Sequence, residues 1–332
     1  MKHLSKSILP ILLILCLMLS GCHMDLPLPT LPENLSVIEP STEAPAAEPP
    51  PTQPPTTVLV EITPVETEPP VTEPPVTEPT EPAPLEVELP EPKDEDFVRV
   101  RDYIPDIVTE LRYATEDNFT GQVIYEFDEL WLRYGTVKKL ICVQETLREK
   151  GLGLKVWDGF RPVVAQFALW KVCPNPAYVA NPNGGYSTHS RGNTVDLTIV
   201  NADGSELVMP TGFDDFSRKA NRDYSDVSQE AAQNARLLES VMKEQGFSSI
   251  YSEWWHFVDH QSYAAEKNFQ PVATTLYESA TPVALLDSNG QAFSYIPPNT
   301  TFPVIAVNGE DFLAEYRGVL GWIRSENIYP AE

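Results

Sequence analysis

The pattern of apolar and polar residues predicts helices over three segments, residues 136–151, 161–172 and 228–246. Pro162 stands in the first turn of the second segment, where proline is favoured. Ser228 is a candidate N-cap for the third segment, and Gly246 follows its end. In the first segment, Cys142 is expected at a core position.

Strands are predicted where apolar and aromatic residues form short runs, over residues 152–159, 193–200 and 250–258. Helices and strands follow one another in mixed order, with hairpin-like connections. This order favours an α+β fold with a mainly antiparallel sheet and flanking helices. We expect the folded domain over residues 97–272, a length that suits one sizeable core.

The last segment, residues 274–332, contains short strands at close spacing with turn signals between them. Such a pattern predicts a small β-barrel. The Gly-Trp pair in "YRGVLGWIRSENIY" is typical of the bacterial SH3-like domains of cell-wall proteins, which this segment resembles. The resemblance implies binding to cell-wall peptides, and the alternative is a structural cap on the domain before it.

The first 22 residues combine two lysines with an apolar run over residues 8–19. This pattern predicts a secretion signal and is too short for a comfortable membrane span. The run ends in Leu-Ser-Gly-Cys, which resembles the lipobox of bacterial lipoproteins. The resemblance implies cleavage before Cys22, lipidation of its thiol, and an extracytoplasmic protein anchored by lipid to the bacterial cell membrane. An ordinary signal peptide or an uncleaved anchor is the alternative.

Composition marks residues 23–96 as a separate segment. It holds 20 of the 33 prolines, with 17 acidic residues against one lysine, so it supplies most of the formal net charge of −25. Its few apolar side chains cannot repay the entropy of ordering, which predicts a disordered, extended tether. The rest of the chain is only mildly acidic, and this argues against nucleic acid as a partner.

Two cysteines remain in the expected folded domain, Cys142 and Cys173. In an exported protein they either pair as a disulfide or stay free, and the sequence favours neither. No second cysteine or histidine lies at ligand spacing from either one, so a zinc site on them is not expected.

Three ionisable residues form a candidate metal site. His189 precedes Asp196 by seven residues, and Asp196 lies in an apolar strand where an unpaired carboxylate is costly. With His256 they make a set of two histidines and one carboxylate, which suits catalytic zinc with a fourth position for water. Glu253, three residues before His256, fits the role of general base.

The spacing alone leaves other interpretations open. His189 as a surface loop residue and His256 as a core histidine bonded to backbone would need no metal. On a regular strand Glu253 and His256 face opposite sides, so a shared site needs a twist, a bulge or a strand end. His260 is expected at the surface rather than as a further ligand.

Several motifs resemble those of a known family. "STHSRGNTVDLTIV" and "SEWWHFV" are similar to the paired zinc motifs of the VanX-type D-alanyl-D-alanine dipeptidases, within the D-Ala-D-Ala metallopeptidase group. "LRYATEDNFTG", "WDGFRP" and "MPTGFDDFS" match further motifs in the same order. The resemblance covers residues 97–270. It implies one zinc ion per catalytic domain, held by His189, Asp196 and His256, with Glu253 as general base.

The same resemblance implies roles for other residues. Arg161 would stabilise the oxyanion of a tetrahedral intermediate, and a structural pairing with Asp158 is the alternative. Asp214, rather than the adjacent Asp215, would receive the free ammonium group of the substrate. Two residues are implied to line the substrate pocket, Tyr113 and Ser187. Their alternatives are a core tyrosine and a loop serine.

These roles imply zinc-dependent hydrolysis of D-Ala-D-Ala to two D-alanines. Export and tethering would also suit a D,D-carboxypeptidase that trims the D-Ala-D-Ala ends of peptidoglycan stem peptides. The acid in "GFDDF" favours the dipeptidase, because a longer peptide offers no ammonium there to a buried carboxylate. A non-catalytic wall-binding lipoprotein is the alternative from another class, and the presence of Glu253 and Arg161 argues against it.

Overall fold

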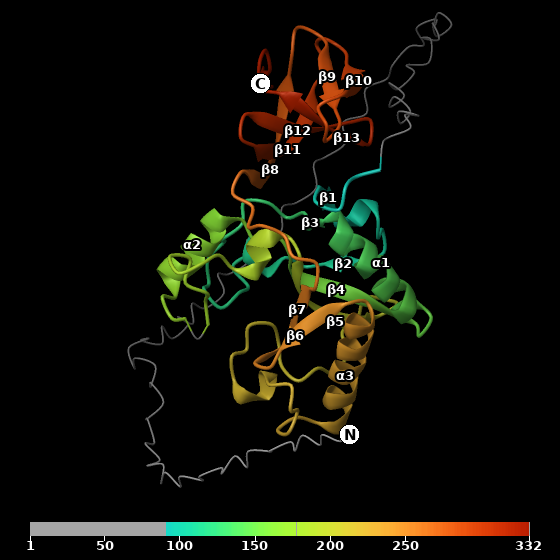
Figure 1. Cartoon of the computed structure of the whole chain (residues 1–332), viewed down its shortest axis with the longest axis vertical. Coiled ribbons are helices and arrows are strands. Elements are labelled where there is room, and N and C mark those ends of the chain that lie inside the picture. Colours follow the sequence, from blue (N-terminus) through green and yellow to red (C-terminus); the bar gives the residue numbers. More distant parts are fainter. Residues whose placement is uncertain (1–90, 177, 332) are drawn as a thin grey trace, which may run out of the picture. The chain divides into compact units, whose positions relative to one another are not determined.

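The computed structural model describes residues 91–176 and 178–331. All of them belong to one unit of the chain, Pro75–Glu332, and Figure 1 labels their helices and strands. The expected signal segment with Cys22 and most of the expected tether lie outside the described residues. In the part of the chain that is described, no helix is long and apolar enough to cross a membrane.

The α-helices are α1 (Tyr134–Arg148), α2 (Val163–Val172) and α3 (Gln229–Glu244). The strands up to residue 259 are β1 (Phe97–Arg99), β2 (Val108–Thr109), β3 (Trp131–Arg133), β4 (Leu152–Asp158), β5 (Thr194–Asn201), β6 (Phe247–Ile250) and β7 (Glu253–Asp259). The later strands are β8 (Phe269–Glu278), β9 (Val283–Leu286), β10 (Ala292–Ile296), β11 (Phe302–Asn308), β12 (Asp311–Tyr316), β13 (Val319–Arg324) and β14 (Tyr329–Pro330).

A five-stranded sheet in the order β2-β4-β5-β7-β6 lies within residues 108–259. Strands β2 and β4 run parallel, and the other neighbouring pairs are antiparallel. Across β4 and β5, Leu154 is paired with Ile199 and Val156 with Leu197. These side chains are fully buried in a core that also contains the inner sides of α1 and α3. The expected α+β fold with a mainly antiparallel sheet is confirmed.

Strand β5 carries apolar residues toward this core and polar residues on its other face. On β5, Val195 and Leu197 are fully buried in the core, and Thr194, Asp196 and Thr198 alternate with them. Successive side chains of a strand point to opposite faces, so Asp196 and its polar neighbours lie on the face away from α1 and α3. Figure 1 shows α2 apart from these two helices.

The predicted helices are present with small shifts at their ends. Helix α1 begins at Tyr134 rather than at residue 136, and it ends at Arg148, shortly before Gly151 with its φ of +71°. Helix α3 has the predicted N-cap, because the Oγ of Ser228 accepts a hydrogen bond from the amide of Ala231 at 3.1 Å.

The strand predicted over residues 250–258 is present from residue 253 onward as β7, but its predicted start was wrong. Strand β6 ends at Ile250 and β7 begins at Glu253, so the segment contains a hairpin turn at residues 251 and 252. The turn consists of Tyr251 and Ser252, and no glycine, proline or asparagine marks it. Tyr251 is largely exposed at the tip, which explains how an aromatic residue fits there.

The prediction of Cys142 as a core residue was also wrong. The buried side of α1 is formed by Leu140, Val143 and other fully buried residues. Cys142 follows Leu140 by two positions, a rotation of about 200° around a helix, which places it on the exposed side. Cys173 is partly exposed, and both thiols are free, so the possible disulfide between them is not formed.

The last part of the chain forms a seven-stranded antiparallel sheet in the order β10-β9-β13-β12-β11-β8-β14. One buried cluster of this sheet consists of Leu285, Ile296, Phe302, Val304, Ala314 and Ile323, whereas Ile305, Ala306 and Leu313 belong to the larger core. Strand β8 begins at Phe269, before the expected boundary at residue 274. Among the described residues the two end strands, β10 and β14, are not paired with each other. The SH3-like barrel stays a prediction.

Candidate metal centre and active site

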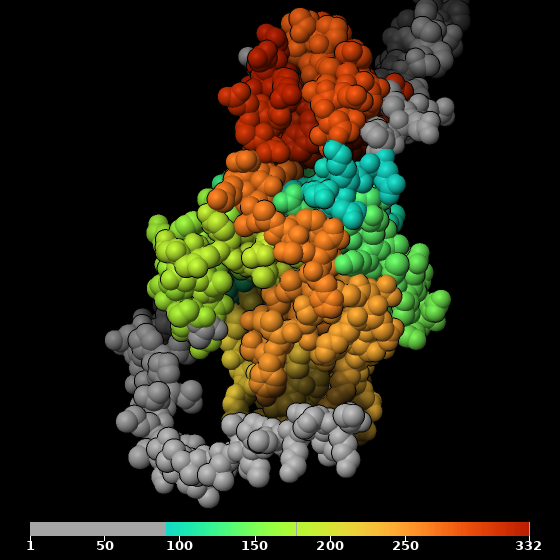
Figure 2. All heavy atoms as spheres, in the orientation of Figure 1, coloured from blue at the N-terminus to red at the C-terminus, as the bar shows by residue number. Residues whose placement is uncertain are grey.

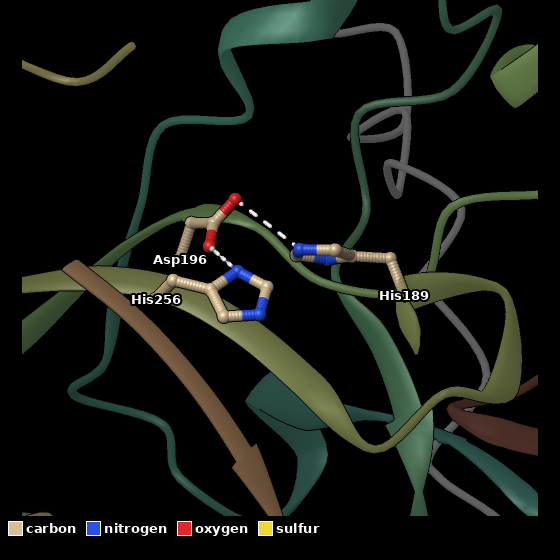
Figure 3. Close-up of side chains that lie close together, drawn as sticks. All are labelled: His189, Asp196 and His256. Atoms are coloured by element: carbon tan, nitrogen blue, oxygen red, sulfur yellow. Dashed lines mark hydrogen bonds and ion pairs between the residues drawn. The ribbon is translucent and has the colours of Figure 1, made fainter. Parts of the chain in front are cut away.

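His189, Asp196 and His256 come together in one buried cluster (Figure 3). The Nε2 of His189 lies 3.3 Å from Oδ2 of Asp196, and the Nδ1 of His256 lies 2.9 Å from Oδ1 of the same carboxylate. One candidate ligand atom from each residue lies within 4.8 Å of the others. The structure therefore unites the three residues that the sequence singled out as a candidate metal site.

The central sheet and a short 3-10 helix hold these side chains in place. Asp196 on β5 is directly paired with His256 on β7. His189 lies on the 3-10 helix Thr188–Arg191, whose N-cap, Ser187, accepts a hydrogen bond from the His189 amide at 3.3 Å. Ser187 is itself buried beside the cluster.

Gly192 ends this 3-10 helix and turns the chain into β5. Its φ of +76° lies in the left-handed region, and a Cβ atom there would come within 2.5 Å of the Phe97 ring. Glycine is therefore needed at this position for two reasons, the backbone conformation and the close approach of the ring. This turn sets where His189 meets the sheet.

The environment of His189 and Asp196 suits metal ligands. The Nδ1 of His189 lies 2.8 Å from the carbonyl oxygen of Gly159, a contact that requires the proton on Nδ1 and leaves Nε2 as the ligand atom. Burial alone would raise the pKa of Asp196, but His189 and His256 outweigh it and hold that pKa well below its usual range. Asp196 is therefore an anion between two imidazole nitrogens.

The donor set fits zinc. Two imidazole nitrogens and one carboxylate oxygen are ligands of catalytic zinc sites, which keep a fourth position for water or substrate. A divalent cation would also compensate the buried charge of Asp196. Over residues 91–176 and 178–331, this is the one group of three histidine, cysteine or acidic side chains placed to hold a metal ion.

Glu253 lies beside the cluster, with its Oε2 3.6 Å from Nδ1 of His256. A regular strand would point the two residues to opposite faces. Glu253 is the first residue of β7, directly after the hairpin turn, and the pairing with β6 shifts between Ser249 and Ile250. This irregular strand end brings the carboxylate to the cluster. Burial raises the pKa of Glu253, which favours proton uptake.

Arg161 is buried next to the same cluster and is paired with Asp158. Its Nε donates to Oδ2 of Asp158 at 3.0 Å, and its Nη2 donates to the same oxygen. Oδ2 of Asp158 also lies 3.4 Å from Nδ1 of His189. The Tyr125 hydroxyl donates a hydrogen bond to the other carboxylate oxygen, Oδ1 of Asp158, at 2.6 Å. The guanidinium carbon lies 5.0 Å from the centre of the Tyr113 ring. The structural pairing is thus present, and it fixes a cation beside the candidate ligands.

Asp214 is joined to the same group of residues through Tyr113. The Tyr113 hydroxyl donates to Oδ2 of Asp214 at 2.8 Å. Burial raises the pKa of Asp214 to about 8, in spite of that hydrogen bond. Its neighbour Asp215 is exposed and accepts a hydrogen bond from the Ser217 amide at 2.9 Å. Of the two acids, Asp214 is therefore the one joined to the network.

Two residues of this network were not predicted from the sequence. Tyr125 reaches Asp158, and Gln166 accepts a hydrogen bond from Arg161 at 3.0 Å. The one available signal was Gln166 itself, an isolated polar residue within an apolar stretch of α2. Tyr125 lies outside any motif and gave none. His260 is exposed, as expected.

Comparison with known proteins identifies a family. The family profile described as D-ala-D-ala dipeptidase, of the M15 peptidases, matches residues 93–274. A D-alanyl-D-alanine dipeptidase of Escherichia coli (strain K12) is 39% identical over 153 residues, covering 46% of this chain and 79% of that protein. The D-alanyl-D-alanine dipeptidase of Enterococcus faecium is 35% identical over 169 residues, covering 45% of this chain and 84% of that protein. The one of Streptomyces coelicolor is 34% identical over 185 residues, covering 49% of this chain and 90% of that protein. This chain therefore belongs to the D-Ala-D-Ala dipeptidase family of M15 peptidases.

Proposed function

We propose that this chain is a zinc-dependent peptidase that hydrolyses D-alanyl-D-alanine to two molecules of D-alanine. The observation that carries the proposal is the buried cluster of His189, Asp196 and His256 with Glu253 beside it. Membership of the family and the names of the relatives support the substrate.

One zinc ion would be held by Nε2 of His189, a carboxylate oxygen of Asp196 and Nδ1 of His256. Bound there, zinc supplies Lewis-acid chemistry, which polarises a peptide carbonyl and makes water more acidic. The hydrogen bond between His189 and the Gly159 carbonyl orients the ring of this ligand.

The protein's own side chains handle the proton and the developing negative charge. Glu253 takes a proton from the attacking water and returns it to the leaving amine. Its raised pKa brings its proton affinity closer to neutral pH, where such exchange is efficient. Arg161 donates hydrogen bonds to the oxygen that gains charge as the carbonyl becomes tetrahedral. Because Asp158 holds this arginine in advance, little reorganisation is needed.

Asp214 and Tyr113 account for a preference for a free dipeptide. An ionised Asp214 pairs with the substrate ammonium, and the hydroxyl of Tyr113 keeps the carboxylate in place. A peptide extended at its N-terminus brings an amide instead and leaves the partly buried carboxylate without a cation. We assign Ser187, buried at the N-cap before His189, to the wall of the same pocket.

A D,D-carboxypeptidase that trims peptidoglycan stem peptides is the second candidate, and the lipobox-like sequence before Cys22 favours it. We propose that the chain is exported, lipid-anchored through Cys22 and tethered by residues 23–96, and that residues 274–332 form an SH3-like domain that binds the cell wall. In cells expressing Cys22→Ser, the protein should leave the membrane fraction. Unchanged membrane association of that variant would argue against the anchor.

Three substrates separate the candidate functions. The mature chain, loaded with zinc, is given D-Ala-D-Ala, N-acetyl-D-Ala-D-Ala and a stem pentapeptide that ends in D-Ala-D-Ala. The dipeptidase is expected to release D-alanine from the free dipeptide alone, because only that substrate has the ammonium. Cleavage of the pentapeptide would establish the carboxypeptidase instead. If all three substrates stay intact, a non-catalytic wall-binding lipoprotein is the better explanation.

A further inference from the structure

Gln166 is a buried polar residue in a surface helix. Figure 2 shows α2 and the segment after it, in yellow-green, at the surface of the domain, and Val164 and Phe167 of this helix are exposed. The side chain of Gln166 instead points inward and is fully buried, as is that of Leu169. A buried amide costs free energy unless its donor and acceptor groups are both satisfied.

The two partners of Gln166 fix the orientation of its amide. Its Oε1 accepts a hydrogen bond from Nη1 of Arg161 at 3.0 Å, and its Nε2 donates to the carbonyl oxygen of Ala180 at 2.7 Å. Rotating the amide by half a turn would set donor against donor at Arg161 and acceptor against acceptor at Ala180. The amide is therefore locked with its oxygen toward Arg161.

Asp158 alone does not fix the plane of the Arg161 guanidinium. The hydrogen bonds from Nε and Nη2 both end on one atom, Oδ2 of Asp158, so the group can pivot about that oxygen. The third contact, from Nη1 to Gln166, removes this freedom. A guanidinium has five N–H groups, and three of them donate to Asp158 and Gln166. The remaining N–H groups therefore point in a fixed direction.

We propose that Gln166 is a positioning residue that orients Arg161 for the transition state. The inference rests on the peptidase function proposed above. Through Ala180 the same amide also ties the arginine to the segment that leads to Ser187, the N-cap of the helix with His189. The orientation of the arginine is thereby coupled to the chain that carries a proposed zinc ligand.

Loss of this contact should reduce the stabilisation of the transition state by Arg161 more than it reduces the affinity for the substrate. The reason is that the substrate carbonyl gains its charge only in the transition state. Methionine is close to glutamine in size and lacks its hydrogen-bonding groups. Gln166→Met should lower kcat about 10- to 100-fold, while KM changes by less than about threefold. Affinity for a phosphinate analogue of the dipeptide, a tetrahedral anion, should fall by a similar factor.

Gln144 of α1 provides a matched control. It is likewise buried, its Nε2 donates to Asp106 at 3.0 Å, and its Oε1 accepts from the Leu154 amide at 2.8 Å. Gln144→Met thus also removes one donated and one accepted hydrogen bond from a buried helix position, and Gln144 does not contact Arg161. This variant should lower Tm about as much as Gln166→Met, yet keep kcat within about threefold of the unsubstituted chain.

The experiment measures kcat, KM, phosphinate affinity, zinc content and Tm for the mature chain and both variants. If Gln166→Met matches Gln144→Met in kcat and phosphinate affinity, the positioning role is wrong. If even the unsubstituted chain and Gln144→Met cleave no dipeptide, the proposed function fails and this inference falls with it. Should Gln166→Met not fold, Gln166→Asn keeps the amide on a side chain too short for both partners. An unchanged kcat in folded Gln166→Asn would equally overturn the role.

Discussion

Three carboxylates close to the candidate metal site differ in their surroundings. Two imidazoles hold the pKa of Asp196 below its usual range, whereas burial raises the pKa of Glu253 and that of Asp214. Surroundings that push pKa values apart allow one residue type to take several roles at one pH. The environment of Asp196 suits a metal ligand, which must be ionised. The environment of Glu253 suits a general base, and that of Asp214 suits a group that binds the substrate ammonium.

The raised pKa of Asp214 predicts that KM for D-Ala-D-Ala depends on pH. With a pKa of about 8, the free carboxyl group is mostly protonated at neutral pH, but only its ionised form pairs with an ammonium. Binding therefore releases a proton, so KM should fall as the pH rises from about 6 toward 8, by up to about tenfold per unit. Above about 8 the substrate ammonium itself deprotonates, and KM should rise again.

Two substitutions at adjacent residues test whether Asp214 binds the substrate ammonium. For each, KM is measured by steady-state kinetics between about pH 6 and 8. Asp214→Asn should raise KM and remove its dependence on pH, because the amide cannot ionise. Asp215→Asn, next to it but exposed, should keep the profile of the unsubstituted chain. A flat KM profile in the unsubstituted chain would contradict the raised pKa of Asp214, and the same loss in both variants would show that Asp214 does not receive the ammonium.

At the scale of elements, the candidate site combines residues at strand ends and turns with residues inside the central strands. Asp158 is the last residue of β4, Glu253 is the first residue of β7, and His189 lies on a 3-10 helix that Gly192 ends. The middles of these strands pack into the core, which gives the ends a rigid base. The other two candidate metal ligands lie inside β5 and β7, so the site depends both on the pairing of these strands and on the turns at their ends.

The turn at Gly192 offers a test at this scale. Gly192→Ala must accept both a positive φ and a Cβ atom 2.5 Å from the Phe97 ring. Gly204→Ala is the control, because Gly204 also has a positive φ, +82°, but has open space around its Cβ position. The control should lose only about 1–2 kcal/mol of stability. Gly192→Ala should lose about 1–3 kcal/mol more, as an overpacked site does.

The second readout is zinc affinity, measured by competition with a chelator. Gly192→Ala should bind zinc more weakly, because the added atom displaces the turn that carries His189, whereas Gly204→Ala should bind it normally. Equal losses of stability and equal zinc affinities in the two variants would mean that the close approach at Phe97 does not set the position of His189.

At the scale of the whole molecule, residues within short motifs could be predicted from the sequence, and contacts across the fold could not. The histidines, Asp196 and Glu253 each lie in a motif whose spacing is visible along the chain. The contact of Gln166 with Arg161 and Ala180 depends on how α2 packs against the segment after it. The fold class followed from the order of helices and strands, but the strand order of the central sheet depends on long-range pairing.

The relatives align with 45–49% of this chain, and the family profile ends at residue 274. Most of the seven-stranded sheet therefore lies beyond the region that is similar to known dipeptidases. This sheet has a small buried cluster that includes Leu285, Phe302 and Ile323, and its residues Ile305 and Leu313 belong to the larger core. The catalytic proposal rests on the region that matches the family, and wall binding rests on the sequence pattern of residues 274–332.

Release of D-alanine from D-Ala-D-Ala by three forms of the mature chain decides whether zinc and Glu253 act in a peptidase. The forms are the metal-free chain, the zinc-loaded chain and zinc-loaded Glu253→Gln. We expect cleavage by the zinc-loaded chain, none without metal, and a rate at least about 100-fold lower for Glu253→Gln, which should still bind zinc. Equal rates with and without zinc, or full activity of Glu253→Gln, would contradict the proposed function.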